Sequence, residues 1–451
     1  MTSTLNTRPP IGNCRVVEFV RRQIRTLTRS ATANRKCQWH RCVVFGIVCA
    51  ICALLLVRPG RCATANAEPT ESVGWRGDGS GRYPLADPVT SWSADRNILW
   101  KTAVGKGNST PVVVGSRVFL TSEPDVLICV DAESGRELWR RVHRLEDISP
   151  EAASKGGRHG SQYGDATPTV VSEGKWIWTF FGTGIVSCHD LNGECRWKNW
   201  YDVRRTTVNG RTSSPVLIGN RLLVHFGSLV CLDSATGKLV WENQQARASY
   251  GTPVAVRIGD VDLVVTPKGD VVRVSDGKTL ASDLGTCTYT SPVVEGRNVY
   301  FLDGTMSAVQ LPETVEEPFE CKELWAGELE GEFFASPLIK DGRIHLVDKA
   351  AKHYVIDSGS GKTILSRVLE LPAAQPDSKA NVFSSPCLAG QRLFISDDSG
   401  QTIVLETADE DAAINKNALP AGSGGTPTFS GKRMFIRGGE FLYCLTVPPK
   451  E

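Results

Sequence analysis

A motif made of a hydroxyl residue, a proline and a short apolar run recurs eight times along the chain. Examples are "STPVVVG" from residue 109, "SSPVLIG" from residue 213 and "SSPCLAG" from residue 384. Successive prolines lie 38 to 57 residues apart, and short strands repeated with a period of about 40 to 45 residues are typical of β-propeller blades. The prolines of the eight copies are Pro111, Pro168, Pro215, Pro253, Pro292, Pro337, Pro386 and Pro427.

A hairpin completes the repeat. In "LVCLDSATGKLVWEN", residues 229–243, two apolar strands flank a turn from Asp233 to Gly237, and the second strand carries Trp241. Asp accepts hydrogen bonds from nearby amides and Gly tolerates a left-handed conformation, so both suit a tight turn. Each repeat therefore divides into four strands, with the Trp packing on a neighbouring blade. We interpret the cysteines at one shared position as small buried residues: Cys129, Cys188, Cys231 and Cys444.

The two ends of the repeat region complement each other. The last repeat, residues 425–447, contains only three strands, whereas "NILWKTAV" at 97–104 has the Trp pattern of a fourth strand and no repeat of its own. Pairing the two would close the ring and remove an open sheet edge. The sequence therefore predicts an all-β fold: an eight-bladed β-propeller of four-stranded antiparallel blades over residues 96–447, closed by the N-terminal strand.

The hydroxyl residue before each proline recurs in every unit, which favours a structural role in bonding the backbone where the strand begins. A ligand site would require asymmetry. Residues 68–95 precede the ring, and we expect them to form an extended segment along its surface. The recurring hydroxyl residues are Thr110, Thr167, Ser214, Thr252, Ser291, Ser336, Ser385 and Thr426.

Residues 1–67 have the features of an export signal. They hold eleven Lys or Arg residues and one acidic residue, and an apolar run at 43–57 precedes Ala65-Asn66-Ala67, an A-x-A cleavage site. The run has 15 residues, fewer than the ~20 that span a bilayer. We predict export to the periplasm or cell surface with cleavage after Ala67; the alternative is an anchor formed by residues 43–57. The rest of the chain is acidic overall, which argues against a nucleic-acid partner.

The chain resembles the PQQ-like β-propeller repeat family. The hydroxyl-Pro strand starts carry the resemblance, together with the D-x-x-[ST]-G-x-x-x-W hairpin at 131–139 and 233–241 and its variant at 190–197. The family includes quinoprotein dehydrogenases, which hold pyrroloquinoline quinone and Ca²⁺, and the eight-bladed lipoprotein of the outer-membrane β-barrel assembly machinery, a binding scaffold. The resemblance implies adjacent cysteines in the dehydrogenase branch and a lipid-modified cysteine in the lipoprotein. The sequence has no Cys-Cys pair and no C-x-x-C-H haem motif, and the flank of Cys62 does not match a lipoprotein box.

Candidate binding residues lie where the repeats differ from one another. Aromatic residues precede several of the prolines and would meet at the channel mouth, although packing between blades is an alternative role. Polar residues in the segments 143–165 and 198–212 could face the same opening, and an exposed loop is the alternative for the first segment. The candidate ligand-binding residues are Arg158, His159, Tyr163, Asp165, Arg211, Tyr250, Tyr289, Phe334 and Phe383.

No sequence motif names a reaction. H-x-x-x-H and H-E-x-x-H metal motifs, a G-x-S-x-G elbow and a phosphate-binding loop are absent from the sequence, so no catalytic residue or metal ligand is predicted. The first hypothesis is an exported scaffold, a monomer or part of a larger complex, that binds a protein, a glycan or a small molecule without catalysis. The alternative is an oxidoreductase that uses pyrroloquinoline quinone with calcium, or a relative that retains the cofactor.

Overall fold

The computed structural model describes residues 72–157, 164–202, 210–371, 380–407 and 413–448. All of them belong to the unit of residues 69–451, so the predicted leader and the alternative anchor at 43–57 lie outside the described residues. Within the ranges given above, no helix has the length and hydropathy needed to cross a bilayer.

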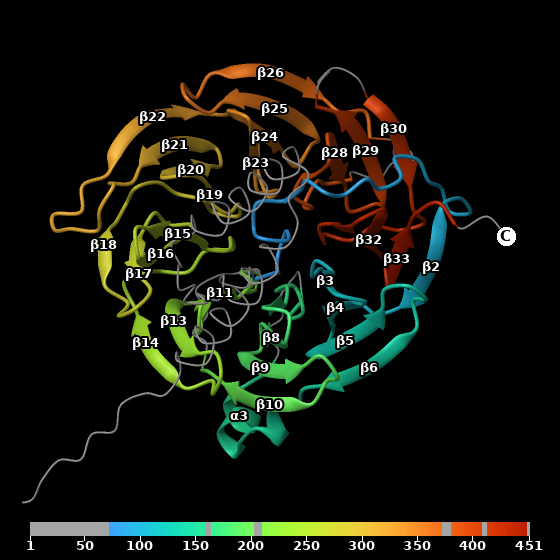
Figure 1. Ribbon diagram of the computed structural model, residues 1–451, viewed down its shortest axis with the longest axis horizontal. Coiled ribbons are helices and arrows are strands. Elements are labelled where there is room, and N and C mark those ends of the chain that lie inside the picture. The colour runs from blue at the N-terminus through green and yellow to red at the C-terminus, as the bar shows by residue number, and fades with distance from the viewer. Residues whose placement is uncertain (1–71, 158–163, 203–209, 372–379, 408–412, 449–451) are drawn as a thin grey trace, which may run out of the picture. The chain divides into compact units, whose positions relative to one another are not determined.

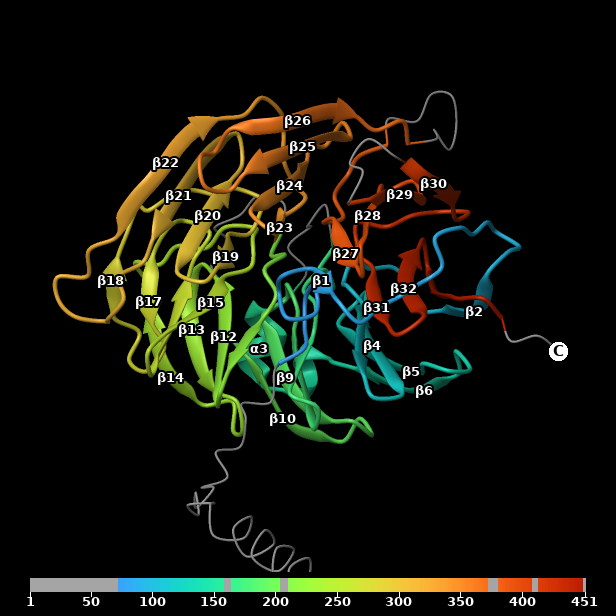
Figure 2. The same cartoon turned by 45° about the horizontal axis from the view of Figure 1, so that its top comes forward.

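The described strands form eight sheets, which surround a central channel as the blades of a propeller (Figure 1). In each blade the first strand lies nearest the channel and the fourth lies at the rim (Figure 2). Blades 1 to 4 comprise β3 (Val112–Val114), β4 (Arg117–Ser122), β5 (Val126–Asp131) and β6 (Glu137–Val142); β7 (Val171–Ser172), β8 (Trp176–Phe180), β9 (Ile185–Asp190) and β10 (Cys195–Trp200); β11 (Val216–Ile218), β12 (Arg221–Phe226), β13 (Ser228–Asp233) and β14 (Leu239–Asn243); and β15 (Val254–Ile258), β16 (Val261–Val265), β17 (Val271–Arg273) and β18 (Thr279–Ala281).

The other four blades repeat this order, and the last of them takes its fourth strand from the N-terminal side of the ring. Blades 5 to 8 comprise β19 (Val293–Glu295), β20 (Asn298–Leu302), β21 (Thr305–Gln310) and β22 (Lys322–Glu328); β23 (Leu338–Lys340), β24 (Arg343–Val347), β25 (Lys352–Asp357) and β26 (Thr363–Val368); β27 (Cys387–Ala389), β28 (Arg392–Ser396), β29 (Gln401–Glu406) and β30 (Ala413–Ala418); and β31 (Thr428–Ser430), β32 (Arg433–Gly438), β33 (Phe441–Leu445) and β2 (Ile98–Ala103).

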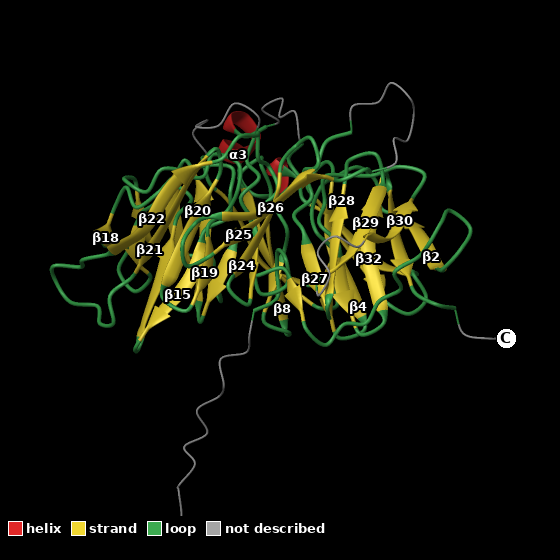
Figure 3. Ribbon diagram, turned by 90° about the horizontal axis from the view of Figure 1, so that it is seen from above, coloured by secondary structure: helices red, strands yellow, loops and turns green. Residues whose placement is uncertain are grey.

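The predicted closure of the ring is confirmed. Strand β2 pairs antiparallel with β33, and Trp100 lies opposite Cys444. The connections between blades lie on one face, which also carries the short helices η1 (Leu145–Asp147) and α3 (Pro150–Lys155); α3 marks this face at the top of Figure 3. We call it the mouth face.

Neighbouring blades are joined by a tryptophan that packs on a glycine. The Trp241 indole on β14 covers Gly277 in the hairpin turn of blade 4, and its Nε1 donates to the Val274 carbonyl at 2.9 Å. A Cβ on Gly277 would lie 2.6 Å from the indole, so this turn needs glycine both for its φ of +74° and for the close approach. The same contact recurs between Trp100 and Gly135, Trp139 and Gly193, Trp197 and Gly237, and Trp325 and Gly361.

Blade 2 departs from the predicted register. Seven first strands begin directly after the repeated proline, but β7 begins at Val171, three residues after Pro168. Thr169 therefore occupies the place that the sequence motif assigns to Thr167, and Val170 stands where the other blades have proline. The Thr167-Pro168 motif of this blade therefore predicts a strand start two residues too early.

The segment before the ring is partly buried, contrary to the expectation of a surface path. Strand β1 (Arg82–Tyr83) adds to blade 7 by parallel pairing with β27. Farther along, Trp92 is 2% exposed in the core shared by blades 7 and 8, stacked on Phe394. Its main-chain amide donates to the Asn417 side chain at 2.9 Å. Blade 7 has no tryptophan on β30, and Trp92 supplies aromatic packing at this junction from outside the repeats.

Candidate functional site at the channel mouth

A ring of hydroxyl side chains surrounds the channel below the mouth. In each of seven successive blade pairs, a main-chain N–H donates to the hydroxyl oxygen of the next blade at 2.8 to 3.1 Å. The predicted backbone role is confirmed for Ser214, Thr252, Ser291, Ser336, Ser385 and Thr426, and Thr169 takes this role in place of Thr167. The hydroxyl ring comprises Thr110, Thr169, Ser214, Thr252, Ser291, Ser336, Ser385 and Thr426.

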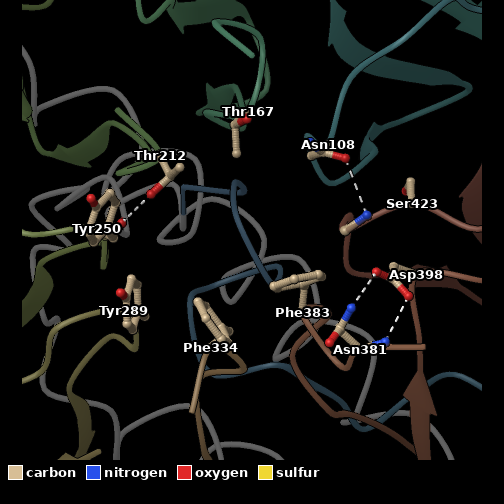
Figure 4. A pocket seen from close by; sticks show the side chains of 11 residues that line it. Asn108, Thr167, Thr212, Tyr250, Tyr289, Phe334, Asn381, Phe383, Asp398 and Ser423 are labelled. Atoms are coloured by element: carbon tan, nitrogen blue, oxygen red, sulfur yellow. Dashed lines mark hydrogen bonds between the residues drawn. The ribbon is translucent and has the colours of Figure 1, made fainter. Parts of the chain in front are cut away.

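A pocket of about 480 Å³ lies above this ring and opens on the mouth face. Figure 4 shows aromatic side chains along one part of its wall and polar side chains along the rest. Each first strand is preceded by a loop that reaches the mouth, which is why residues from several blades meet here. The pocket is lined by Asn108, Thr167, Thr212, Tyr250, Tyr289, Phe334, Asn381, Phe383, Asp398, Ser423 and Gly424.

Four of the aromatic residues singled out from the sequence form a continuous arc in this pocket. Tyr250 stacks on Tyr289 with ring centroids 5.0 Å apart, Tyr289 contacts Phe334 at 4.4 Å, and Phe334 meets Phe383 edge-on at 5.0 Å. All four rings are partly exposed. They pack against one another, as the alternative of packing between blades requires, and they also present apolar surface to the pocket. We call these four side chains the aromatic arc.

The polar wall contains residues that the sequence analysis did not identify. Asp398, in the hairpin between β28 and β29, accepts from the Asn381 main-chain and side-chain N–H groups at 2.8 and 3.3 Å. Asn108 accepts from the Gly424 amide at 3.2 Å, and Thr212 donates to the Tyr250 carbonyl at 2.7 Å. Asn108 lies two residues upstream of the repeated hydroxyl residue Thr110, and Asn381 lies five residues upstream of the repeated proline Pro386. This nearness to the motif is a sequence signal for both asparagines, whereas Asp398 has no repeated sequence signal.

The remaining predicted residues are not part of the described pocket wall. Asp165 and Arg211 are buried beside the mouth, where the Asp165 carbonyl accepts from the Gly182 amide at 2.7 Å and Arg211 donates to the Gly182 carbonyl. Arg158, His159 and Tyr163 lie outside the described residues.

Charge is sparse in the pocket wall. Among its described residues Asp398 carries the single carboxylate, and no Lys or Arg lines it. The neighbouring Asp397 is buried, and desolvation raises the pKa of its carboxyl group. Lys349 lies outside the wall, 5.5 Å from the Phe334 ring centre, and pairs with Glu332 at 3.1 Å.

These residues do not fit pyrroloquinoline quinone with Ca²⁺. The quinone is a tricarboxylate, for which the described wall offers no basic side chain, and Ca²⁺ requires six to eight oxygen ligands. Both oxygens of Asp398 already accept from Asn381. In the described part of the chain no three His, Cys, Asp or Glu side chains are grouped to hold a metal. The eight cysteines there are free; Cys129, Cys188, Cys231 and Cys444 are buried, as interpreted from the sequence.

Comparison with known proteins identifies the family. A family model described as outer membrane protein assembly factor BamB matches residues 87–313. A protein of that name from Moranella endobia (strain PCIT) is 23% identical over 376 residues, which cover 75% of this chain and 87% of the relative.

Two solved structures share the fold. BamB from Moraxella catarrhalis has a TM-score of 0.53 at 13% identity, covering 78% of this chain and 98% of that one. A europium-containing methanol dehydrogenase has a TM-score of 0.54 at 13% identity, covering 79% and 87%. At such identities these two structures establish the propeller fold alone. The family model spans half of the chain, and the chain therefore belongs to the family of outer membrane protein assembly factor BamB.

Proposed function

We propose that this chain is an exported, non-catalytic scaffold that binds a protein partner during assembly of outer-membrane proteins. The match of residues 87–313 to the assembly-factor family carries the proposal. The relative from Moranella endobia is named for the same activity and aligns over most of its length. A rigid ring that presents a shaped surface, without a grouped set of catalytic side chains in its described pocket, suits such a role.

The mouth face is the proposed partner surface. The aromatic arc offers partly exposed apolar area on a rigid support, and aromatic side chains held in this way often dominate binding energy at protein interfaces. Asn108, Asn381 and Asp398 supply polar groups beside it. A partner loop could therefore bury apolar side chains against the arc while its backbone bonds to the polar wall.

Export is part of the same proposal. Residues 1–67 direct the chain to the periplasm, with cleavage after Ala67, and retention of the run at 43–57 as an anchor is the alternative. Cell fractionation with N-terminal sequencing of the purified mature protein separates the two: a mature chain that begins at Glu68 supports cleavage, and one that retains residues 43–57 supports the anchor.

Site-specific photo-crosslinking in the native cell tests the partner surface. A crosslinking amino acid at Tyr289 or Phe383 should trap a component of the outer-membrane assembly apparatus. The same amino acid at Ile364 is the control, because that side chain is 52% exposed on rim strand β26. Equal trapping of that component at the rim, or none at the mouth, would refute the proposed surface. The double variant Tyr289→Ala/Phe334→Ala should also lower the amount of β-barrel proteins in the outer membrane while the variant protein itself accumulates normally.

A neutral glycan is a second candidate ligand. Amide and hydroxyl side chains face the aromatic arc in one pocket (Figure 4), and this pairing suits a ligand with hydroxyl groups and apolar ring faces. Binding on a carbohydrate array that is lost in Tyr250→Ala would support it. A blank array together with a positive crosslinking result would leave the protein partner as the function of the mouth.

A further inference from the structure

The channel narrows below the mouth pocket to a small polar cavity, which we call the neck. It has a volume of about 120 Å³, and all eight residues of the hydroxyl ring line it. Trp75, from the segment before the ring, also lines it. The neck thus joins the aromatic arc above to the N-terminal segment below.

The hydroxyl ring has unused donor capacity. Each hydroxyl is one donor and two acceptor positions, and seven oxygens of the ring accept a main-chain N–H from the preceding blade. No hydroxyl of the ring donates to another described residue. The protons of these hydroxyls are therefore available to an acceptor group inside the neck.

A strap made of residues 72–83 crosses the far end of the channel and is visible as the blue segment at the centre of Figure 1. Val73 pairs with Ser172 of blade 2, and β1 pairs with blade 7. Trp75 and Arg76 lie between these two attachments. Trp75 of the strap lines the neck at this far end.

Arg76 places a positive charge beside the far end of the neck. Its side chain is fully buried, and its guanidinium donates to the carbonyls of Pro337 at 2.8 Å and Pro386 at 3.2 Å. Its Nε has no hydrogen-bond partner, and its guanidinium also donates to the Ser80 carbonyl at 3.3 Å. Within the described residues no carboxylate forms an ion pair with it, and the charge of Asp78 acts on it from farther away. The guanidinium stacks 5.3 Å from the Trp75 ring centre. A buried cation without a directly paired counter-ion leaves a positive potential in its surroundings.

The two prolines that Arg76 contacts directly follow Ser336 and Ser385 of the hydroxyl ring. Two residues upstream of those serines are Phe334 and Phe383 of the aromatic arc. Blades 6 and 7 therefore align three layers along the channel: apolar rings at the mouth, hydroxyl donors in the neck and a cation beyond its far end. We propose that the neck binds the carboxylate of a small organic acid at Ser336 and Ser385, with the apolar body of the acid against Phe334 and Phe383.

This subsite recognises a carboxylate with an apolar body. It shares Phe334 and Phe383 with the partner surface proposed for the mouth face, but its polar part, Ser336 and Ser385, lies in the neck. The hydroxyls donate directly to the carboxylate, and Arg76 acts through its charge, because its guanidinium does not line the neck. The neck offers hydroxyl donors for one carboxylate, and the described wall of the mouth pocket offers no basic side chain for the two further carboxylates of pyrroloquinoline quinone, which separates this subsite from a cofactor site.

Isothermal titration with phenylacetate tests the proposal, with phenylacetamide as the uncharged isostere. Phenylacetate should bind the full mature chain and the amide should bind at least about tenfold more weakly, since hydrogen bonds to a charged acceptor are the stronger class. Equal binding of the two compounds, or no binding of either up to tens of millimolar, would overturn the proposal.

Two matched variants test whether the subsite lies at Ser385. Ser385→Ala and Ser214→Ala each remove one ring hydroxyl that accepts a single main-chain N–H, at 3.0 Å in both cases. Only Ser385 adjoins the Arg76 contact, so Ser385→Ala should raise the Kd for phenylacetate about tenfold while Ser214→Ala leaves it within about twofold. Equal effects of the two variants would mean that the hydroxyls serve the ring alone and would refute the subsite. Arg76→Gln should weaken phenylacetate without changing the amide; if that variant does not fold, the two serine variants decide the question.

Discussion

Replacing Gly277 with alanine isolates the contact that joins blade 3 to blade 4. The new Cβ would meet the Trp241 indole at 2.6 Å in a turn whose φ is +74°. A left-handed conformation costs a non-glycine residue about 1 kcal/mol, and overpacking a close contact costs about 1 to 3 kcal/mol. We therefore expect Gly277→Ala to reduce the free energy of unfolding by about 2 to 4 kcal/mol.

Gly259 is the matched control in the same blade. Its φ is +57°, but a Cβ there would meet nothing within 4 Å, so Gly259→Ala should lose only the backbone term of about 1 kcal/mol. The assay is urea denaturation followed by circular dichroism, with the transition midpoint and slope compared among the variants.

A double-mutant cycle then tests whether the indole causes the difference. In a Trp241→Ala background the steric conflict is absent, so adding Gly277→Ala should cost no more than Gly259→Ala does. Equal destabilisation by Gly277→Ala and Gly259→Ala in the parent chain would refute the reasoning, as would an unchanged cost of Gly277→Ala after the indole is removed.

Three further outcomes are expected. Deleting residues 97–104 should prevent cooperative folding, because blade 8 loses β2 and exposes the edge of β33; an unchanged melting profile would contradict the closure. Thr169→Val should lower the melting temperature more than Thr167→Val, since Thr169 accepts the Thr110 amide, and the reverse order by calorimetry would restore the register expected from the sequence. Burial lowers the pKa of His225 to about 4, below the unfolded value of about 6.5. Between these values the unfolded chain binds a proton that the folded chain does not. About 3 kcal/mol of stability, fully present above pH 6.5, is therefore lost as the pH falls from 6.5 towards 4. Urea midpoints measured across that range should fall less steeply in His225→Gln, and identical slopes would show that this histidine is not responsible.

Much of the fold could be predicted because each blade repeats the same short-range sequence signals. Proline at the start of a strand, Asp and Gly in a turn, and Trp on the outer strand act through backbone conformation and short-range packing, which a sequence displays directly. The prediction was wrong at Thr167 because it located the strand start from the proline. In blade 2 the hydroxyl contact uses Thr169, and that choice depends on the neighbouring blades.

The candidate site was less accessible to sequence reasoning. Tyr250, Tyr289, Phe334 and Phe383 could be grouped because they share a position before the prolines. Asp398 and Asn108 line the same pocket but come from different parts of their repeats, so no spacing connects them. That these side chains bind a ligand is still a prediction.

The sequence by itself determined the eight-bladed ring and its closure, since those depend on repeated local patterns and on one unmatched strand. The tertiary structure decided what the non-repeating residues do. Trp92 enters the junction of blades 7 and 8, and Arg76 reaches carbonyls 261 and 310 residues away in the chain. Such contacts join residues that are distant in sequence, and they are not repeated from blade to blade. A periodic sequence pattern therefore cannot predict them, because they form only when the ring brings the distant segments together.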